Sequence, residues 1–355
     1  MISLKELRVG VIGCGWIAQS AHIPAYVENQ RSRLVAICDV NEERLKKVAM
    51  KYKGTRLFSD YRELLESNLV DAVSICTPTA THSKVAIAAA ENGIHTLCEK
   101  PLASNLSEAR EIAEAVSQSK IKFMAGFNYR FLPNHVKAKK IVDTGKIGKP
   151  ILIRGEVVAP GPYRPDICEE DRPYEAEKRI GAFFDLGCHI ADLFLWMMGE
   201  VKDVFANFAT HVDNTTVDDT ATALLKFRSG VLGVITVAWL HLPDYQAITD
   251  NRMIEIIGSK GKVESELFGP SLYFYGLDSI TSKIMGKVRI TPVKLDPRLP
   301  DEAMKWSYKK EIDTFLECIV RDKEPRITVD QAIDALKVIE SAYASAKTRS
   351  AINLE

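Results

Sequence analysis

An excess of charge of either sign, closely paired cysteines and a long hydrophobic run are all missing from this chain. Its 355 residues include 47 Lys plus Arg and 47 Asp plus Glu, so the formal net charge is zero. A neutral chain has no electrostatic attraction to nucleic acid or to an anionic membrane surface. The longest uncharged apolar run, residues 231–240, is far shorter than the roughly 18 residues of a membrane span. We therefore expect neither nucleic acid nor a membrane among its partners.

The seven cysteines are scattered along the chain, without a CxxC pair or the spacing of zinc ligands. Such cysteines are typical of small buried side chains in a reducing compartment. Because no other cluster of ligands is visible, we predict no metal. No signal peptide is visible either, and we expect a cytoplasmic protein.

The first third of the chain alternates strand-like and helix-like segments. A chain of 355 residues exceeds one ordinary core, so we expect about two domains. Apolar strands are expected at residues 8–12, 34–38, 72–76, 96–98 and 122–125. Helices are expected at residues 17–29, 41–52, 62–67, 83–91 and 107–118. This alternation predicts a doubly wound parallel sheet with both faces covered, an α/β Rossmann domain over residues 1–126.

Residues 127–355 show a different pattern, in which strands follow one another without helices between them. Strands are expected at residues 151–158, 204–210, 221–227, 231–240, 253–257 and 262–266. Helices are expected at residues 134–143, 184–198, 306–321 and 329–347. The pattern predicts an α+β domain with a large open, mainly antiparallel sheet. Because residues 221–225 and 231–240 show little polar alternation, we predict a homodimer or homotetramer formed through this sheet.

A glycine turn directly follows the first expected strand. Gly13 permits a tight turn, and Gly15 lets the backbone approach a pyrophosphate. Ala18 lets the next helix pack closely on the strand, and the start of that helix offers free N–H groups to phosphates. Trp16 and Ile17 complete the turn, and we expect Trp16 to cover the edge of the pyrophosphate. The alternative is an ordinary strand–turn–helix glycine pair, but the flanking strand and helix favour a dinucleotide site.

Asp39 closes the second expected strand, at the distance from the turn that is typical of a ribose-binding carboxylate. There it can accept hydrogen bonds from both ribose hydroxyls. It would also repel a 2′-phosphate, so we predict NAD as the cofactor. Arg44 and Lys46 follow within a turn and could relax this preference, which leaves NADP possible. The alternative for Asp39 is a carboxylate at a helix N-terminus beside Asn41.

Further motifs make the chain similar to a known family over nearly its whole length. The first is Cys76-Thr77-Pro78 with His82, and the second is Cys98-Glu99-Lys100-Pro101-Leu102-Ala103. The third lies at residues 126–131, the fourth is the D-x-G-x-H-x-x-D sequence of residues 185–192, and the fifth lies at residues 256–261. In this order the motifs resemble the glucose–fructose oxidoreductase, inositol dehydrogenase and rhizopine catabolism (Gfo/Idh/MocA) family of oxidoreductases.

The resemblance implies roles for three catalytic residues. Lys100, at the carboxyl end of a strand, would hydrogen-bond the substrate oxygen as hydride leaves the carbon. His189 would accept the proton of the substrate hydroxyl, and Asp185, four residues earlier, would orient the substrate or the imidazole. The alternatives are a surface lysine paired with Glu99 and a solvated helical stripe. A cis peptide bond before Pro101 is also implied.

Other residues of the motifs are implied to line the site. Thr77, Pro78, His82 and Glu99 would join Lys100 at the cofactor. For His82, and for His22 as well, helix packing is an equally good interpretation.

Substrate recognition is the least defined part of the sequence. Tyr129 and Arg130 would contact the substrate together with Lys100, Asp185 and His189, although packing between domains is an alternative for both. The chain departs from the family before the histidine helix, where the family often has consecutive glycines. The loop at residues 159–180, with Lys178 and Arg179, could bind an acidic substituent or could simply be a solvated charge cluster.

Taken together, these motifs predict an NAD(P)-dependent oxidoreductase. Hydride would pass between nicotinamide and a secondary hydroxyl or ketone of a sugar, an inositol or a related cyclic polyol. One alternative is an enzyme that uses NAD transiently in a net non-redox sugar cleavage. Another is a non-catalytic sensor that binds a dinucleotide, but the presence of Lys100 and His189 favours an enzyme.

Overall fold

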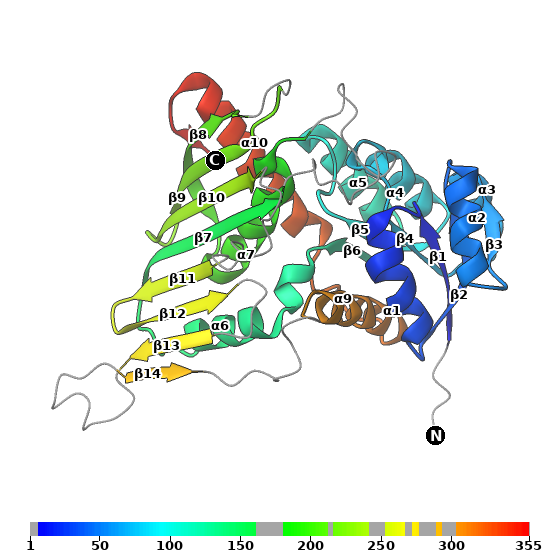
Figure 1. The fold of residues 1–355 in the computed structure, drawn as a ribbon, viewed down its shortest axis with the longest axis horizontal. Coiled ribbons are helices and arrows are strands. Elements are labelled where there is room, and N and C mark those ends of the chain that lie inside the picture. Colours follow the sequence, from blue (N-terminus) through cyan, green and yellow to red (C-terminus); the bar gives the residue numbers. More distant parts are fainter. Residues whose placement is uncertain are drawn as a thin grey trace. The chain divides into compact units, whose positions relative to one another are not determined.

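The computed structural model describes residues 6–160, 180–211, 216–240, 253–266, 272–276, 289–292 and 303–354. The chain divides into two compact units. The first contains Met1–Asn128 and Lys305–Leu336, and the second contains Tyr129–Met304 and Lys337–Glu355. Figure 1 shows the parallel sheet of the first unit in blue and cyan and the larger sheet of the second in green and yellow.

The first unit is built on a parallel sheet, as predicted. Its strand order is β3-β2-β1-β4-β5-β6, and every neighbouring pair is parallel. The strands are β1 (Leu7–Ile12), β2 (Ser32–Cys38), β3 (Arg56–Phe58), β4 (Ala72–Ile75), β5 (His95–Glu99) and β6 (Phe123–Gly126). The strand order reverses its direction between β1 and β4. Open α/β sheets bind their ligands at such a switch point, outside the carboxyl ends of the strands.

Local sequence signals explain where the helices of this unit begin. The side chains of Asn41, Asp60 and Asn105 each accept a hydrogen bond from the first turn of the helix that follows. The helices and helical turns are η1 (Ala18–His22), α1 (Ile23–Glu28), α2 (Glu42–Lys51), α3 (Tyr61–Glu66), η2 (Thr79–Thr81), α4 (His82–Glu91) and α5 (Leu106–Gln118). The chain passes from the first unit to the second within the short 3-10 turn η3 (Asn128–Phe131).

Two local predictions for this unit need correction. The helix expected at residues 17–29 is divided into the π-helical turn η1 and the short helix α1, which has Pro24 in its first turn. Strand β3 was not expected, because two of its three residues are exposed and the segment is too short to show a periodic pattern.

A segment from near the end of the chain packs into the first unit. It contains most of helix α9 (Ala303–Val320) and the start of helix α10 (Val329–Thr348). Arg31 forms an ion pair with Asp313 of α9 at 2.6 Å, and Ala125 of β6 donates a backbone hydrogen bond to Ile327 at 3.1 Å. This grouping differs from the expected division into residues 1–126 and 127–355, since no local pattern signals that residues 305–336 return to the first sheet.

The second unit contains a mixed sheet in which nine strands are described. Their order is β14-β13-β12-β11-β7-β10-β9-β8-β15. The strands are β7 (Pro150–Pro160), β8 (Val201–Ala209), β9 (Thr220–Phe227), β10 (Leu232–Leu240), β11 (Met253–Gly258), β12 (Gly261–Glu266), β13 (Leu272–Gly276), β14 (Arg289–Pro292) and β15 (Ile352–Asn353). The predicted mainly antiparallel sheet is confirmed, with β7 and β10 as a parallel pair. Strands β13, β14 and β15 were not expected.

Helices cover one face of this sheet and leave residues of the other face exposed. The helix α7 (Cys188–Met198) follows the π-helical turn η5 (Phe183–Gly187) and contacts β7 and β10. The helix α6 (Pro133–Asp143) precedes β7 and contacts β12. Along β9, buried residues alternate with exposed ones, which include Leu224. Within residues 221–225 the exposed positions are Thr222 and Leu224, one small and one apolar, and Lys226 is the next exposed residue of the strand.

Candidate active site

The glycine turn at the end of β1 has the geometry of a phosphate cradle. Gly13 has a φ of +90°, and a Cβ there would lie 2.6 Å from the backbone carbonyl of Cys76. At Gly15 the opposite holds, because a Cβ would meet nothing within 4 Å. Gly13 therefore closes the turn against the end of β4, and the space beside the Gly15 backbone fits the close approach of a pyrophosphate.

The residues after this turn enter the π-helical turn η1. Trp16 is 63% exposed, Ile17 is half-buried, and Ala18 is completely buried against the sheet. π-helical turns often occur at functional sites. The exposed indole beside the cradle agrees with its expected place over a bound pyrophosphate.

Asp39 lies beside the cradle and is already surrounded by donors. One carboxylate oxygen, Oδ2, accepts hydrogen bonds from the backbone N of Cys14 at 2.7 Å and from Nε of Arg44 at 3.0 Å. The other, Oδ1, accepts from the backbone N of Asn41 at 2.8 Å and from the Arg44 guanidinium at 3.2 Å. A carboxylate offers about four lone-pair directions, and all four are used here. The Arg44 guanidinium must therefore move away before Asp39 can accept hydrogen bonds from both ribose hydroxyls.

His82 joins the loop after β4 to the loop after β5. Its ring nitrogens lie 2.9 Å from the carbonyl oxygen of Pro101 and 2.8 Å from that of Thr77. Burial lowers the pKa of His82, and the ring is only 1% exposed. The imidazole thus holds Thr77 and the exposed Pro78 against the cis-proline loop, and its direct contact with a cofactor stays a prediction.

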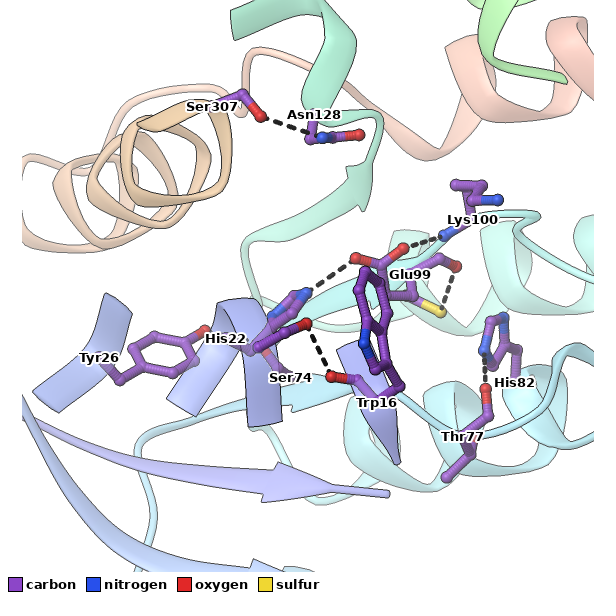
Figure 2. Close-up of polar contacts among 12 residues, drawn as sticks. Trp16, His22, Tyr26, Ser74, Thr77, His82, Glu99, Lys100, Asn128 and Ser307 are labelled. Carbon is purple, nitrogen blue, oxygen red and sulfur yellow. Dashed lines mark hydrogen bonds and ion pairs between the residues drawn. The ribbon is translucent and has the colours of Figure 1, made fainter. Parts of the chain in front are cut away.

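Glu99 and Lys100 end strand β5, at the same edge of the sheet as the glycine cradle. The Lys100–Pro101 peptide bond is cis, as the resemblance implies. Glu99 is 5% exposed, and its Oε2 accepts a hydrogen bond from the backbone N of Lys100 at 3.1 Å (Figure 2). Lys100 is half-buried.

Three buried residues complete this strand end: His22, which the sequence left between a cofactor-site role and helix packing, and Ser74 and Tyr26, which were not selected from the sequence. The imidazole Nε2 of His22 lies 2.8 Å from Oε1 of Glu99, and its Nδ1 lies 3.0 Å from Oγ of Ser74. The same Ser74 oxygen lies 2.7 Å from the hydroxyl of Tyr26 (Figure 2). Sequence spacing gave no signal for this network, because its members lie up to 77 positions apart.

The second unit carries the histidine helix. Asp185 is half-buried in the π-helical turn η5, and His189 is 5% exposed in the first turn of α7. The buried side chain of Asp218 holds the start of this segment: its Oδ2 accepts from the backbone N of Phe183, and its Oδ1 accepts from the Tyr343 hydroxyl. Burial raises the pKa of Asp218. The predicted continuous helix 184–198 is thus interrupted by a π-helical turn at Asp185.

Gly181 lies so close to Asp218 that position 181 has no room for a side chain. A Cβ at Gly181 would overlap the carboxylate of Asp218. The single glycine that stands here therefore serves packing at the anchor.

Tyr129 and Arg130 are both buried within the second unit. The ring of Tyr129 stacks on that of His189, with centroids 3.9 Å apart and an interplanar angle of 9°. Arg130 donates two hydrogen bonds to Asp192, from Nε at 2.8 Å and from the terminal nitrogen at 2.6 Å. This bidentate ion pair gives Arg130 a structural role, and its contact with a substrate stays a prediction.

Other predicted features receive less support from the geometry. Lys178 and Arg179 of the expected recognition loop lie outside the described residues.

Six buried free cysteines are described, and burial raises the pKa of Cys14 and of Cys38 to about 12, so these two are inert thiols. Within the described ranges, no three His, Cys, Asp or Glu residues are grouped as metal ligands would be. Among the helices described, none combines the length and the apolar character needed to cross a membrane.

Comparisons with known proteins identify the family. Residues 7–127 match the model of the oxidoreductase family with an NAD-binding Rossmann fold, and residues 135–264 match the model of the GFO/IDH/MocA C-terminal domain. The chain belongs to the Gfo/Idh/MocA family of oxidoreductases. The first unit of this family member is therefore an NAD-binding Rossmann domain, which confirms the predicted family, fold class and cofactor.

Named relatives of this Gfo/Idh/MocA oxidoreductase match it over its full length. The myo-inositol 2-dehydrogenase of Thermotoga maritima is 30% identical, over 98% of this chain and 99% of the relative. The inositol 2-dehydrogenase of Rhizobium meliloti is 28% identical, over 98% and 99%. Among solved structures, a probable dehydrogenase from Thermotoga maritima is similar with a TM-score of 0.79 and 30% identity, over 98% of this chain and 99% of that chain.

Proposed function

We propose that this chain is an NAD-dependent dehydrogenase that oxidises a secondary hydroxyl of an inositol, or of a related cyclic polyol or sugar, and reduces the ketone in reverse. Its full-length similarity to two inositol dehydrogenases is the observation that carries the substrate class. The bound nicotinamide would supply the hydride acceptor. The glycine cradle and Asp39 fit the dinucleotide.

Lys100 is the residue that would act on the substrate oxygen. Its place at the carboxyl end of β5, next to the buried Glu99 carboxylate, supports this role. The ammonium would donate a hydrogen bond to that oxygen and stabilise the negative charge that develops when the hydroxyl proton is removed.

His189 would remove that proton as general base, and Asp185 would orient the substrate or the imidazole. Their place at the start of α7, on a segment anchored by Asp218, supports a fixed geometry. Imidazole suits this role because its ordinary pKa lies near neutrality. The arrangement fits net dehydrogenation, with the proton and the hydride leaving separately.

A panel assay tests the proposal. The protein would be incubated with NAD and, one at a time, with inositols, aldoses and sugar acids, and the absorbance of reduced nicotinamide would be followed. We expect a signal with at least one cyclic polyol or sugar, and a loss of about 100-fold or more in the Lys100→Met variant. Silence across the panel, from protein shown to bind NADH by fluorescence, would contradict the proposal and favour a sensor or a transient use of NAD.

The oligomeric state and the location are further parts of this proposal. Leu224 of β9 and Leu232 of β10 are 50% and 53% exposed on the sheet face away from α7, and these exposed leucines support a homodimer or homotetramer. Light scattering at micromolar concentration tests this, and a monomer would overturn it. The buried free thiols support a cytoplasmic location.

A further inference from the structure

A chain of four buried side chains ends at the carboxylate that precedes Lys100. Tyr26, His22 and Ser74 are completely buried, and Glu99 is 5% exposed. His22 therefore has no surface with which to touch a substrate or a cofactor. Its two ring nitrogens contact Ser74 and Glu99 (Figure 2). His22 can therefore affect the reaction only through those two side chains.

One set of hydrogen-bond directions satisfies every contact of this network with a neutral imidazole. Burial strongly raises the pKa of Tyr26, so its hydroxyl stays protonated and can donate to Ser74 Oγ. The Ser74 hydroxyl then donates to Nδ1 of His22, which leaves the ring proton on Nε2, where it is donated to Oε1 of Glu99. In this set of directions Tyr26 and Ser74 select the tautomer that binds Glu99.

The network also links the elements that build the two parts of the cofactor site. His22 ends the π-helical turn η1, which begins three residues after Gly15 of the cradle. Ser74 lies on β4, and Glu99 ends β5. With Oε1 held by His22 and Oε2 by the backbone N of Lys100, the carboxylate and the Lys100 backbone are fixed relative to the glycine turn.

We propose that His22 is a positioning residue for hydride transfer: as the Nε2–H tautomer it holds Glu99 and thereby fixes the strand end that presents Lys100. The inference rests on the proposed dehydrogenase function. A hydrogen bond from His22 to a buried carboxylate is charge-assisted and geometrically strict, so its loss lets the strand end shift. Small displacements of a reacting group reduce turnover much more than they reduce binding.

Two variants of His22 separate its two hydrogen bonds. In His22→Gln the terminal amide N–H can replace Nε2 and still donate to Glu99. In His22→Asn the shorter amide can still accept from Ser74 but is too short to reach Glu99. We expect turnover of His22→Gln to stay close to that of the wild type, and that of His22→Asn to fall about ten- to a hundredfold, with KM and the Kd of NADH little changed in both.

A matched control measures the cost of losing buried hydrogen bonds elsewhere. Ser345 of the second unit accepts a hydrogen bond from the backbone N of Ala206 and donates one to the carbonyl of Ser350. Ser345→Ala should lower the unfolding midpoint and leave kcat unchanged. If His22→Asn also keeps wild-type kcat, or if both His22 variants lose turnover equally, the positioning role is wrong.

A second readout does not depend on turnover. Imidazole nitrogen chemical shifts of the cofactor-free protein, assigned by the signal that disappears in His22→Gln, should report the Nε2–H tautomer of His22 at neutral pH. The Nδ1–H tautomer or a doubly protonated ring would overturn the inference. Failure of the panel assay with the expected tautomer present would count against the proposed function and not against this hydrogen-bond network.

Discussion

Tyr129 lies flat against His189, with the ring centroids 3.9 Å apart and the planes inclined by 9°. Both side chains are at most 5% exposed, and the backbone carbonyl of Tyr129 is itself held by Nδ1 of His135 at 2.9 Å. The proposed general base thus rests on a ring whose own backbone is fixed. This arrangement gives Tyr129 a role in orienting His189, besides any contact with a substrate.

Substitutions of Tyr129 test the contribution of the stack. Tyr129→Phe keeps the aromatic face and should retain most of kcat, whereas Tyr129→Leu should lower kcat about two- to tenfold, because an aromatic pair contributes about 0.5–1.5 kcal/mol. The measurement is kcat and KM on the substrate that the panel identifies. A Phe variant as slow as the Leu variant would assign the effect to the hydroxyl instead.

The two glycines of the cradle should respond differently to alanine. Gly13→Ala forces a side chain into a φ of +90° and against the Cys76 carbonyl, so we expect a loss of about 2–4 kcal/mol in the free energy of unfolding. Gly15→Ala meets no atom within 4 Å, so it should keep its stability but bind NADH more weakly. Urea unfolding and fluorescence titration measure the two effects. Equal losses of stability in Gly13→Ala and Gly15→Ala would show that the Cys76 carbonyl does not restrict the backbone at Gly13.

Arg44 should control the choice between NAD and NADP. Because it forms a bidentate pair with Asp39, Arg44→Ala frees the carboxylate for the ribose hydroxyls and should strengthen the preference for NADH over NADPH. Asp39→Ala should release the guanidinium for a 2′-phosphate and reverse the preference. Dissociation constants of both reduced cofactors for the two variants measure this. Unchanged ratios would mean that neither residue sets cofactor choice.

Stability should decline on acidification partly through His135. Burial lowers its pKa from 6.5 to about 4, and its Nε2 has no hydrogen-bond partner among the described residues. The unfolded chain binds the proton more readily, so the stabilisation is complete above pH 6.5 and is lost as the pH falls toward 4. Between pH 7 and pH 5 this amounts to about 2 kcal/mol.

His135→Asn removes this titration, and its amide nitrogen, placed as Nδ1 is, keeps a donor for the Tyr129 carbonyl. Its free energy of unfolding, measured in urea at the two pH values, should therefore fall less than that of the wild type. An identical decline in both proteins would show that the low pKa of His135 does not contribute.

The sequence predicted those features that depend on short-range pattern. Alternating apolar strands and amphipathic helices gave the parallel sheet, and Asn41 marked the start of α2 because a side-chain cap acts within one turn. Strands β3, β13, β14 and β15, which have two to five residues, escaped prediction, since each is defined by its neighbour in the sheet. Strand pairing is a tertiary effect that local propensity does not report.

The residues of the candidate site also fall into two groups: those that local motifs reveal and those that only folding brings together. The cradle, Asp39, Lys100 and His189 stand in motifs of fixed spacing, which a single sequence displays. Two partners do not: His22 on Glu99 and Tyr129 on His189 are brought together by folding, across separations that carry no periodic signal. The same is true of Asp218, whose role depends on a backbone 35 positions away. Arg44, five positions after Asp39, is close enough in the sequence to be recognised beside it.

The most direct test of the central claim follows a labelled hydrogen. The compound that gives the strongest signal in the panel would be deuterated at its secondary carbinol carbons and incubated with the protein and NAD. The cofactor would then be recovered, and its mass would be measured by mass spectrometry. We expect reduced cofactor that carries one deuterium, together with the corresponding ketone, and almost none of either with Lys100→Met. Cofactor recovered oxidised, beside a substrate that has been cleaved or left unchanged, would contradict the claim.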